Sequence, residues 1–167
     1  MHGFQLWINL PAREKMIEPG YRDIPADVIP HLTADGGVTI RIIAGSVAGI
    51  RGAVRREATE PLFLDLQVPA GTAYAAAIPA GHNAFLYVYD GEAEIGARGE
   101  PVRARQLAVL SNRADADGVR LATSAGARLL LAAGRPLKEP VVQWGPFVMN
   151  TREEVEQAVR DFRSGKF

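Results

Sequence analysis

The stretch Leu62-Phe63-Leu64-Asp65-Leu66-Gln67-Val68 decides the fold class of this chain. Its aliphatic residues Leu62, Leu64, Leu66 and Val68 stand at every second position. Successive side chains of a β-strand point to opposite faces, so these four residues would share one face. The pattern therefore predicts a strand with one buried face.

Further segments have the composition of short strands. They are Phe4–Asn9, Val38–Ala44, Gln106–Leu110, Gly118–Ala122 and Leu129–Ala133. In addition, Phe85–Tyr89 leads into Asp90-Gly91 and then Glu92–Ile95, which predicts a β-hairpin because Asp-Gly suits a tight turn. With 17 glycines and 11 prolines along the chain, this succession of short strands predicts an all-β sandwich or barrel.

One helix is predicted at the end of the sequence. Thr151 and Glu154 have the spacing of a capping box, in which each side chain bonds a backbone N–H that the helix leaves free. The apolar residues that follow at helical spacing are Val155, Ala158, Val159 and Phe162. Gly165 is suited to end the helix.

The segment from Pro11 to Pro30 has no sustained periodicity and contains several prolines, so we expect an extended arm there. The chain then divides into an N-terminal strand and arm (1–30), a barrel (31–143), and a C-terminal segment with the helix (144–167).

Composition excludes several classes of function. The 167 residues include 19 Lys and Arg, 19 Asp and Glu, and no cysteine. The balanced charge gives no bulk attraction for nucleic acid, and the absence of cysteine excludes disulfides and thiolate chemistry. The first residues lack the pattern of a signal peptide and no apolar run is long enough to span a bilayer. We therefore expect a soluble, cytoplasmic protein without membrane or direct nucleic-acid partners.

Five segments together resemble the pirin family. They are His2–Pro11, Lys15–Tyr21, Pro79–Phe85, Pro136–Val142 and Trp144–Glu154. Pirins are similar to bicupins, with two β-barrels packed face to face, and the resemblance covers only the C-terminal half of such a protein. It implies a cupin barrel (a double-stranded β-helix or jelly roll) with an N-terminal extended arm and one C-terminal α-helix.

The resemblance also implies where a cofactor would be bound. In the family one metal ion, such as iron, lies in the N-terminal barrel on three histidines and one glutamate, all preceding the segment that begins at His2. Counting the cupin ligand pattern back from Gly91 places Ala84 at the carboxylate position and apolar residues near Ala77 and Pro79 at the paired-histidine positions. The facing segment, 110–116, contains no histidine. We therefore predict no metal ligand, no cofactor and no catalytic residue in this chain.

The histidines and a basic cluster have two interpretations each. His82 could line the mouth of the barrel, although a turn histidine bonded to local backbone is the commoner case. His31 is expected to be exposed, and His2 could bind metal only weakly with the terminal amine. A cluster formed by Arg51, Arg55 and Arg56 is typical of a solvated loop, neutralised by nearby Glu57 and Glu60.

The aromatic residues near both ends carry the remaining prediction. Phe4, Trp7, Trp144 and Phe147 lie in segments that resemble the family most closely. They either form an interface with another barrel or fill the core of this one, and the sequence pattern fits both alternatives.

Three hypotheses follow. The first is a non-catalytic cupin module that acts by association, with a second copy or with a separate metal-binding half. The second is a subunit or fragment of a quercetin 2,3-dioxygenase-like enzyme whose metal site another chain supplies. The third is a truncated product, since Met1 stands directly before a family segment.

Overall fold

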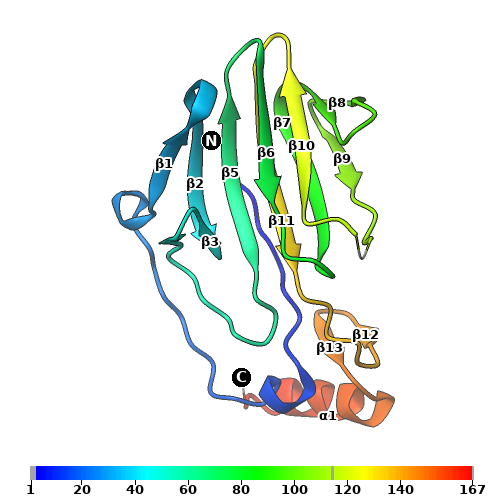
Figure 1. The fold of residues 1–167 in the computed structure, drawn as a ribbon. Coiled ribbons are helices and arrows are strands. Elements are labelled where there is room, and N and C mark those ends of the chain that lie inside the picture. The colour runs from blue at the N-terminus through cyan, green and yellow to red at the C-terminus, as the bar shows by residue number, and fades with distance from the viewer. Residues whose placement is uncertain (1–2, 114, 167) are drawn as a thin grey trace. The chain divides into compact units, whose positions relative to one another are not determined.

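The computed structural model describes residues 3–113 and 115–166. The chain forms two compact units (Figure 1). One, which we call the end unit, combines Met1–Tyr21 with Leu137–Phe167, and the other, the barrel unit, is Arg22–Pro136.

The barrel unit is a curled antiparallel sheet. Its strands are β1 (His31–Ala34), β2 (Val38–Ala44), β3 (Ser46–Val47), β4 (Ile50–Arg51), β5 (Leu62–Val68), β6 (Thr72–Ala77), β7 (Asn83–Ile95), β8 (Glu100–Arg103), β9 (Gln106–Val109), β10 (Gly118–Thr123) and β11 (Ala127–Gly134). The main path runs β1-β2-β5-β11-β7-β10-β6, with β8 and β9 also paired to β7, while β3 and β4 form a separate pair. Short 3₁₀ turns lie at Ala26–Val28 and Asp35–Gly37. The predicted all-β barrel fold is confirmed.

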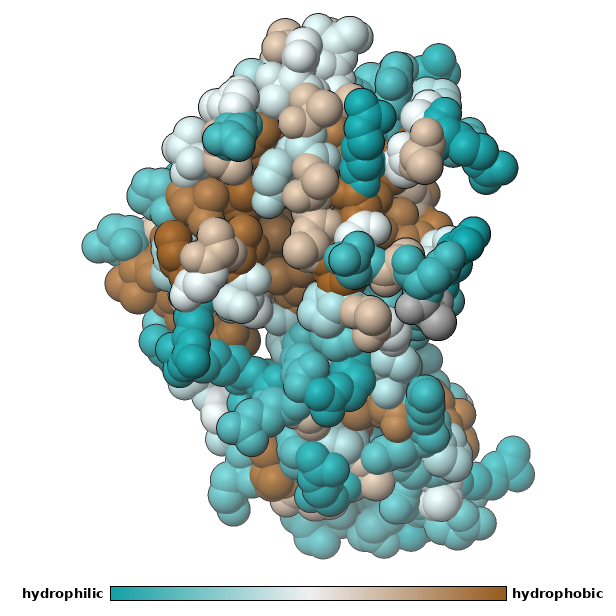
Figure 2. All heavy atoms as spheres, in the orientation of Figure 1, coloured by the Kyte–Doolittle hydropathy of each residue, from teal (hydrophilic) through white to brown (hydrophobic). Residues whose placement is uncertain are grey.

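The core follows the alternation seen in the sequence. Leu62, Leu64, Leu66 and Val68 of β5 are all buried, as predicted. The largest fully buried side chains of the barrel unit are Ile40, Ile42, Leu64, Leu66, Leu86, Leu121, Leu129, Leu131, Val38, Val68 and Val88. Partly buried residues such as Leu32 and Val47 pack against this core, and Figure 2 shows hydrophobic surface over β1, β2 and β5.

The predicted hairpin at Asp90-Gly91 is wrong. Strand β7 continues through both residues, with Asp90 opposite Arg128 and Gly91 opposite Ala127 of β11. Val88 pairs with Leu129, so β7 carries one extra residue, Tyr89, and the irregularity is a β-bulge. Gly91 has φ of 75°, the left-handed conformation that bulges and tight turns both require.

This bulge lets one strand serve two layers of the barrel. Before it, β7 pairs with β9 and β11; after it, residues from Glu92 to Ile95 pair with β8 and β10. A bulge increases the local twist and bends the strand, so β7 turns the corner between the layers without a loop.

The end unit contains 3₁₀ turn Ala12–Glu14, strands β12 (Val142–Trp144) and β13 (Phe147–Met149), and helix α1 (Arg152–Arg163). The capping box is present as predicted: the Glu154 N–H donates to the Thr151 hydroxyl, and the Glu154 carboxylate accepts from the Thr151 N–H. The predicted strand Phe4–Asn9 is wrong, because these residues are extended but belong to no ladder among the described residues.

Polar contacts join the two parts of the end unit. The Lys15 ammonium group donates one hydrogen bond to the Asn9 side-chain oxygen at 2.6 Å and another to the Val148 carbonyl at 2.7 Å. The Ala12 N–H donates to the Glu139 carboxylate at 2.7 Å. The arm near residues 9–15 is therefore tied to the segment that leads into α1, more than 120 residues later in the sequence.

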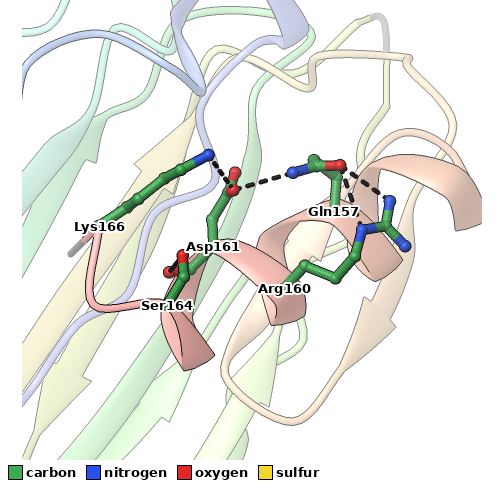
Figure 3. Close-up of polar contacts among 5 residues, drawn as sticks. All are labelled: Gln157, Arg160, Asp161, Ser164 and Lys166. Atoms are coloured by element: carbon green, nitrogen blue, oxygen red, sulfur yellow. Dashed lines mark hydrogen bonds and ion pairs between the residues drawn. The ribbon is translucent and has the colours of Figure 1, made fainter.

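The last turn of α1 is closed by a buried carboxylate (Figure 3). Asp161 is 7% exposed and accepts hydrogen bonds from Lys166 at 2.6 Å and from Gln157 at 2.8 Å. The hydrogen bond from Lys166 is the main cause that holds the pKa of Asp161 below its ordinary value. Among the described residues no helix is both long and apolar enough to cross a membrane.

Candidate functional site at the mouth of the barrel

A cavity of about 740 Å³ opens at one end of the barrel unit. Strands β2 and β6 end at this cavity, and β5, β7 and β10 begin beside it. The loop that joins β2 to β5 forms the other wall and contains β3 and β4. We call this cavity, lined by residues of 45–62, 77–82 and Asp117, the barrel mouth.

His82 lies at the barrel mouth in a tight turn that precedes β7. Its N–H donates to the Pro79 carbonyl at 3.1 Å, while its ring is only 4% exposed. The ring Nε2 lies 3.4 Å from a carboxylate oxygen of Glu60. The ring Nδ1 is buried and has no hydrogen-bond partner among the described residues. The imidazole ring therefore faces a carboxylate from another segment. The local hydrogen bond expected for a turn histidine is made by the backbone N–H of His82 and not by its ring.

Glu60 is held by two other residues. Its carboxylate forms an ion pair with Arg135, and its N–H donates to the Arg56 carbonyl at 3.0 Å. The Arg135 N–H in turn donates to the Thr59 carbonyl at 2.7 Å. Glu60 has φ of 41°, a left-handed conformation that costs a non-glycine residue about 1–3 kcal/mol and persists only where neighbours enforce it.

The three arginines of the basic cluster line the barrel mouth. The expectation that Glu57 and Glu60 neutralise them does not hold for Glu60, whose carboxylate pairs with Arg135 and faces His82. Among residues 3–113 and 115–166, Arg51, Arg55 and Arg56 take part in no ion pair. The chemistry available here is recognition of negative charge.

The residues inside the barrel do not fit a metal ion. At the positions that the cupin pattern assigns to ligands stand Ala77, Pro79 and Ala84, and the interior is formed by alkyl side chains. Within the described part of the chain no three His, Asp or Glu residues converge on one point. Iron is held by imidazole and carboxylate donors, and such donors do not meet here.

The remaining candidate positions are the other histidines and the aromatic residues. His31 begins β1 and is exposed; His2 lies outside the described residues, as does Ala114 of the segment 110–116. Phe4, Trp7 and Trp144 are 48%, 71% and 60% exposed, so they do not fill a core.

Phe147 is half-buried and meets Phe162 edge to face, with 6.0 Å between the ring centres. Its ring therefore takes part in the packing of β13 against α1.

Sequence reasoning missed Arg135 at the site. It stands 75 residues from Glu60, and no local pattern connects the two.

The Pirin C-terminal cupin domain family matches residues 63–167. The chain belongs to the pirin family. The resemblance stated from the sequence is thereby confirmed.

Two curated relatives illustrate the extent of the match to this pirin-family chain. A Pseudomonas aeruginosa protein named "Putative quercetin 2,3-dioxygenase" is 49% identical over 99% of this chain and 59% of its own length. The human protein named "Pirin" is 40% identical over 99% of this chain and 57% of its own length. The chain thus spans less than two thirds of the curated pirins it matches.

A solved structure agrees with the fold. A crystal structure titled as quercetin 2,3-dioxygenase from Acinetobacter baumannii superimposes with a TM-score of 0.88 at 31% identity. The match covers 96% of this pirin-family chain and 55% of that chain.

Proposed function

We propose that this chain is a non-catalytic cupin half of pirin type, which acts by associating with a metal-binding cupin half or with a second copy of itself. The observation that carries the proposal is the distribution of exposed hydrophobic residues. Ten of the fourteen large hydrophobic residues exposed in the described chain belong to the end unit. They are Phe4, Leu6, Trp7, Ile8, Met16, Ile17, Tyr21, Val141, Trp144 and Phe162.

This concentration in one unit supports association, because a surface on which large apolar side chains gather marks an interaction site. Burial of one large apolar side chain stabilises an assembly by about 1.5–3 kcal/mol. Tryptophan is especially effective at interfaces, since its ring carries a large apolar area and an N–H donor. Trp7 and Trp144 are therefore the residues whose loss should weaken association most.

The barrel interior supports the non-catalytic part of the proposal. Its alkyl side chains offer no donors to a metal, so chemistry that depends on one would need residues from elsewhere. At the barrel mouth the cavity is lined by Arg51, Arg55 and Arg56, which suit recognition of negative charge rather than bond cleavage.

A second candidate is supported by the names of the relatives. Two similar proteins carry the name quercetin 2,3-dioxygenase, and each is longer than this chain. In this alternative the chain completes a metal-dependent dioxygenase for quercetin or a related flavonol, while the other half supplies the metal site.

The test uses the full chain alone and co-expressed with a metal-binding cupin half of a pirin relative. Light scattering is expected to show a complex or a dimer, and the double variant Trp7→Ser/Trp144→Ser is expected to weaken it at least about tenfold. The matched control is Leu107→Ser, which changes a residue 52% exposed in the barrel unit and should leave association unchanged.

Two outcomes would contradict the proposal. The first is a chain that remains a stable monomer and binds no cupin half. The second is tight binding of one equivalent of iron, nickel or copper by the chain alone, measured by elemental analysis. Oxygen uptake with quercetin by the co-expressed complex, and not by either part alone, would favour the second candidate; its absence would count against that candidate only.

A further inference from the structure

We propose that the barrel mouth binds a small organic carboxylate with an apolar body. The site is built from the basic loop between β2 and β5 and from the strand ends that face it. The inference concerns a ligand of the barrel unit and is independent of how the end unit associates.

The charge at the cavity favours an anion. Arg51, Arg55 and Arg56 line it, and among the described residues no carboxylate pairs with any of them. The other charged groups not taken up by a described ion pair are Glu57 and Asp117, which leaves an excess of one positive charge. Arginine binds carboxylates through two parallel N–H bonds, so the residue type suits this ligand class.

The walls between these charges favour a ligand with an apolar body. Val54, Pro61, Leu62, Ile78 and Pro79 contribute aliphatic surface to the cavity. Its volume of about 740 Å³ lies within the range of about 300–1,000 Å³ that small-molecule sites occupy. An apolar wall with a few charged groups is the usual composition of such a site.

The cluster of His82, Glu60 and Arg135 gives the site a fixed shape. Glu60 is held by Arg135 and faces the buried ring of His82, so the loop that carries the arginines is anchored at both β7 and β11. Glu60 adopts its left-handed φ at this anchor. A loop held in one conformation loses less entropy on binding, which strengthens recognition by the arginines. His82, Glu60 and Arg135 are positioning residues in this proposal.

Inorganic phosphate is the main competitor for the same arginines, because two of its charged oxygens can also accept parallel N–H bonds from a guanidinium. It has no apolar body and gains nothing from the aliphatic wall. Comparison of three probes therefore separates the contributions: benzoate has both features, benzamide has the apolar body alone, and phosphate has the charge alone.

The experiment records amide NMR spectra of the ¹⁵N-labelled full chain during titration with each probe. Benzoate is expected to shift the amides of residues 45–62 and 77–82 and to bind at least about tenfold more tightly than benzamide or phosphate. The variant Arg55→Gln/Arg56→Gln is expected to weaken benzoate binding at least about tenfold. Both side chains are exposed, so the fold should survive their replacement.

The matched control is Arg98→Gln, since Arg98 is 87% exposed and lies in the turn between β7 and β8, outside the cavity lining. Its affinity for benzoate should equal that of the unmodified chain. The proposal is overturned if benzamide or phosphate binds as tightly as benzoate, if the double variant retains full affinity, or if benzoate shifts no amide of these segments.

Discussion

Replacement of Gly91 by alanine is the sharpest test of the continuous strand β7. At φ of 75° an alanine costs about 1–2 kcal/mol more than glycine. Its Cβ would also lie 2.2 Å from the Gly126 carbonyl oxygen and 3.1 Å from Ala127 Cα, both backbone atoms of the segment that leads into β11. Forcing two packed segments apart costs about 1–3 kcal/mol, so the total loss of stability should be about 2–5 kcal/mol.

Gly96→Ala is the matched control. Gly96 has φ of 78° but no atom within 4 Å of the added Cβ, so it should lose only the conformational part, about 1–2 kcal/mol. Urea denaturation of both variants, followed by far-UV circular dichroism, measures the difference. With a slope of about 2 kcal/mol per molar urea, Gly91→Ala should unfold about 0.5–1.5 M earlier than Gly96→Ala. Coincident midpoints would refute the close contact between β7 and β11 and revive a simple turn at Asp90-Gly91.

Three further predictions concern single side chains. Burial, with a hydrogen bond to Asp65 as a second cause, raises the pKa of Tyr89 to about 12. An ultraviolet titration should therefore show a phenol that ionises well above pH 10 and that is missing from the variant Tyr89→Phe. The stability that this group contributes should decline as the pH rises from 10 toward 12. Lys166→Ala should raise the lowered pKa of Asp161 toward 3.8, as carboxyl NMR would show, and remove stability that is present above about pH 4 and is lost as pH falls through the lower folded-state pKa. Leu129→Ala should lower the free energy of unfolding, measured by urea denaturation, by about 2.7–5 kcal/mol because the side chain is fully buried. The control Leu107→Ala, on the exposed face of β9, should change it by less than about 0.5 kcal/mol.

Regular patterns predicted most of the fold. The alternation in Leu62–Val68 predicts a strand because one buried face imposes a period of two on the residues. The capping box at Thr151 and Glu154 predicts the start of α1 because its bonds are local. Both signals depend only on neighbours in the sequence.

The errors arose where one local signal suits two structures. Asp90-Gly91 supplies a left-handed glycine, which a hairpin turn and a bulge both use, and only the pairing partner across the sheet distinguishes them. Phe4–Asn9 has the composition of a strand, but strand formation depends on a neighbour with free hydrogen-bonding groups.

The candidate site was less predictable than the fold. His82 was a candidate from its place before a strand, but the burial of its ring and its contact with Glu60 result from the folding of the barrel. Arg135 pairs with the Glu60 carboxylate, which is then not available to the arginines of the basic cluster. It lies directly after β11, far from the loop in sequence. Charge balance along the sequence therefore did not describe charge balance in space.

The end unit is made of two segments that lie on either side of the barrel unit in the sequence, and this has a consequence for synthesis on the ribosome. Arg22–Pro136 is continuous and can begin to fold as it emerges, whereas the end unit lacks its second part until Leu137 and the residues after it have been translated. Until then the hydrophobic residues near the start of the chain, such as Trp7 and Met16, have no completed unit to join. The hydrogen bond from Lys15 to the Val148 carbonyl can therefore form only after the whole barrel unit has been translated.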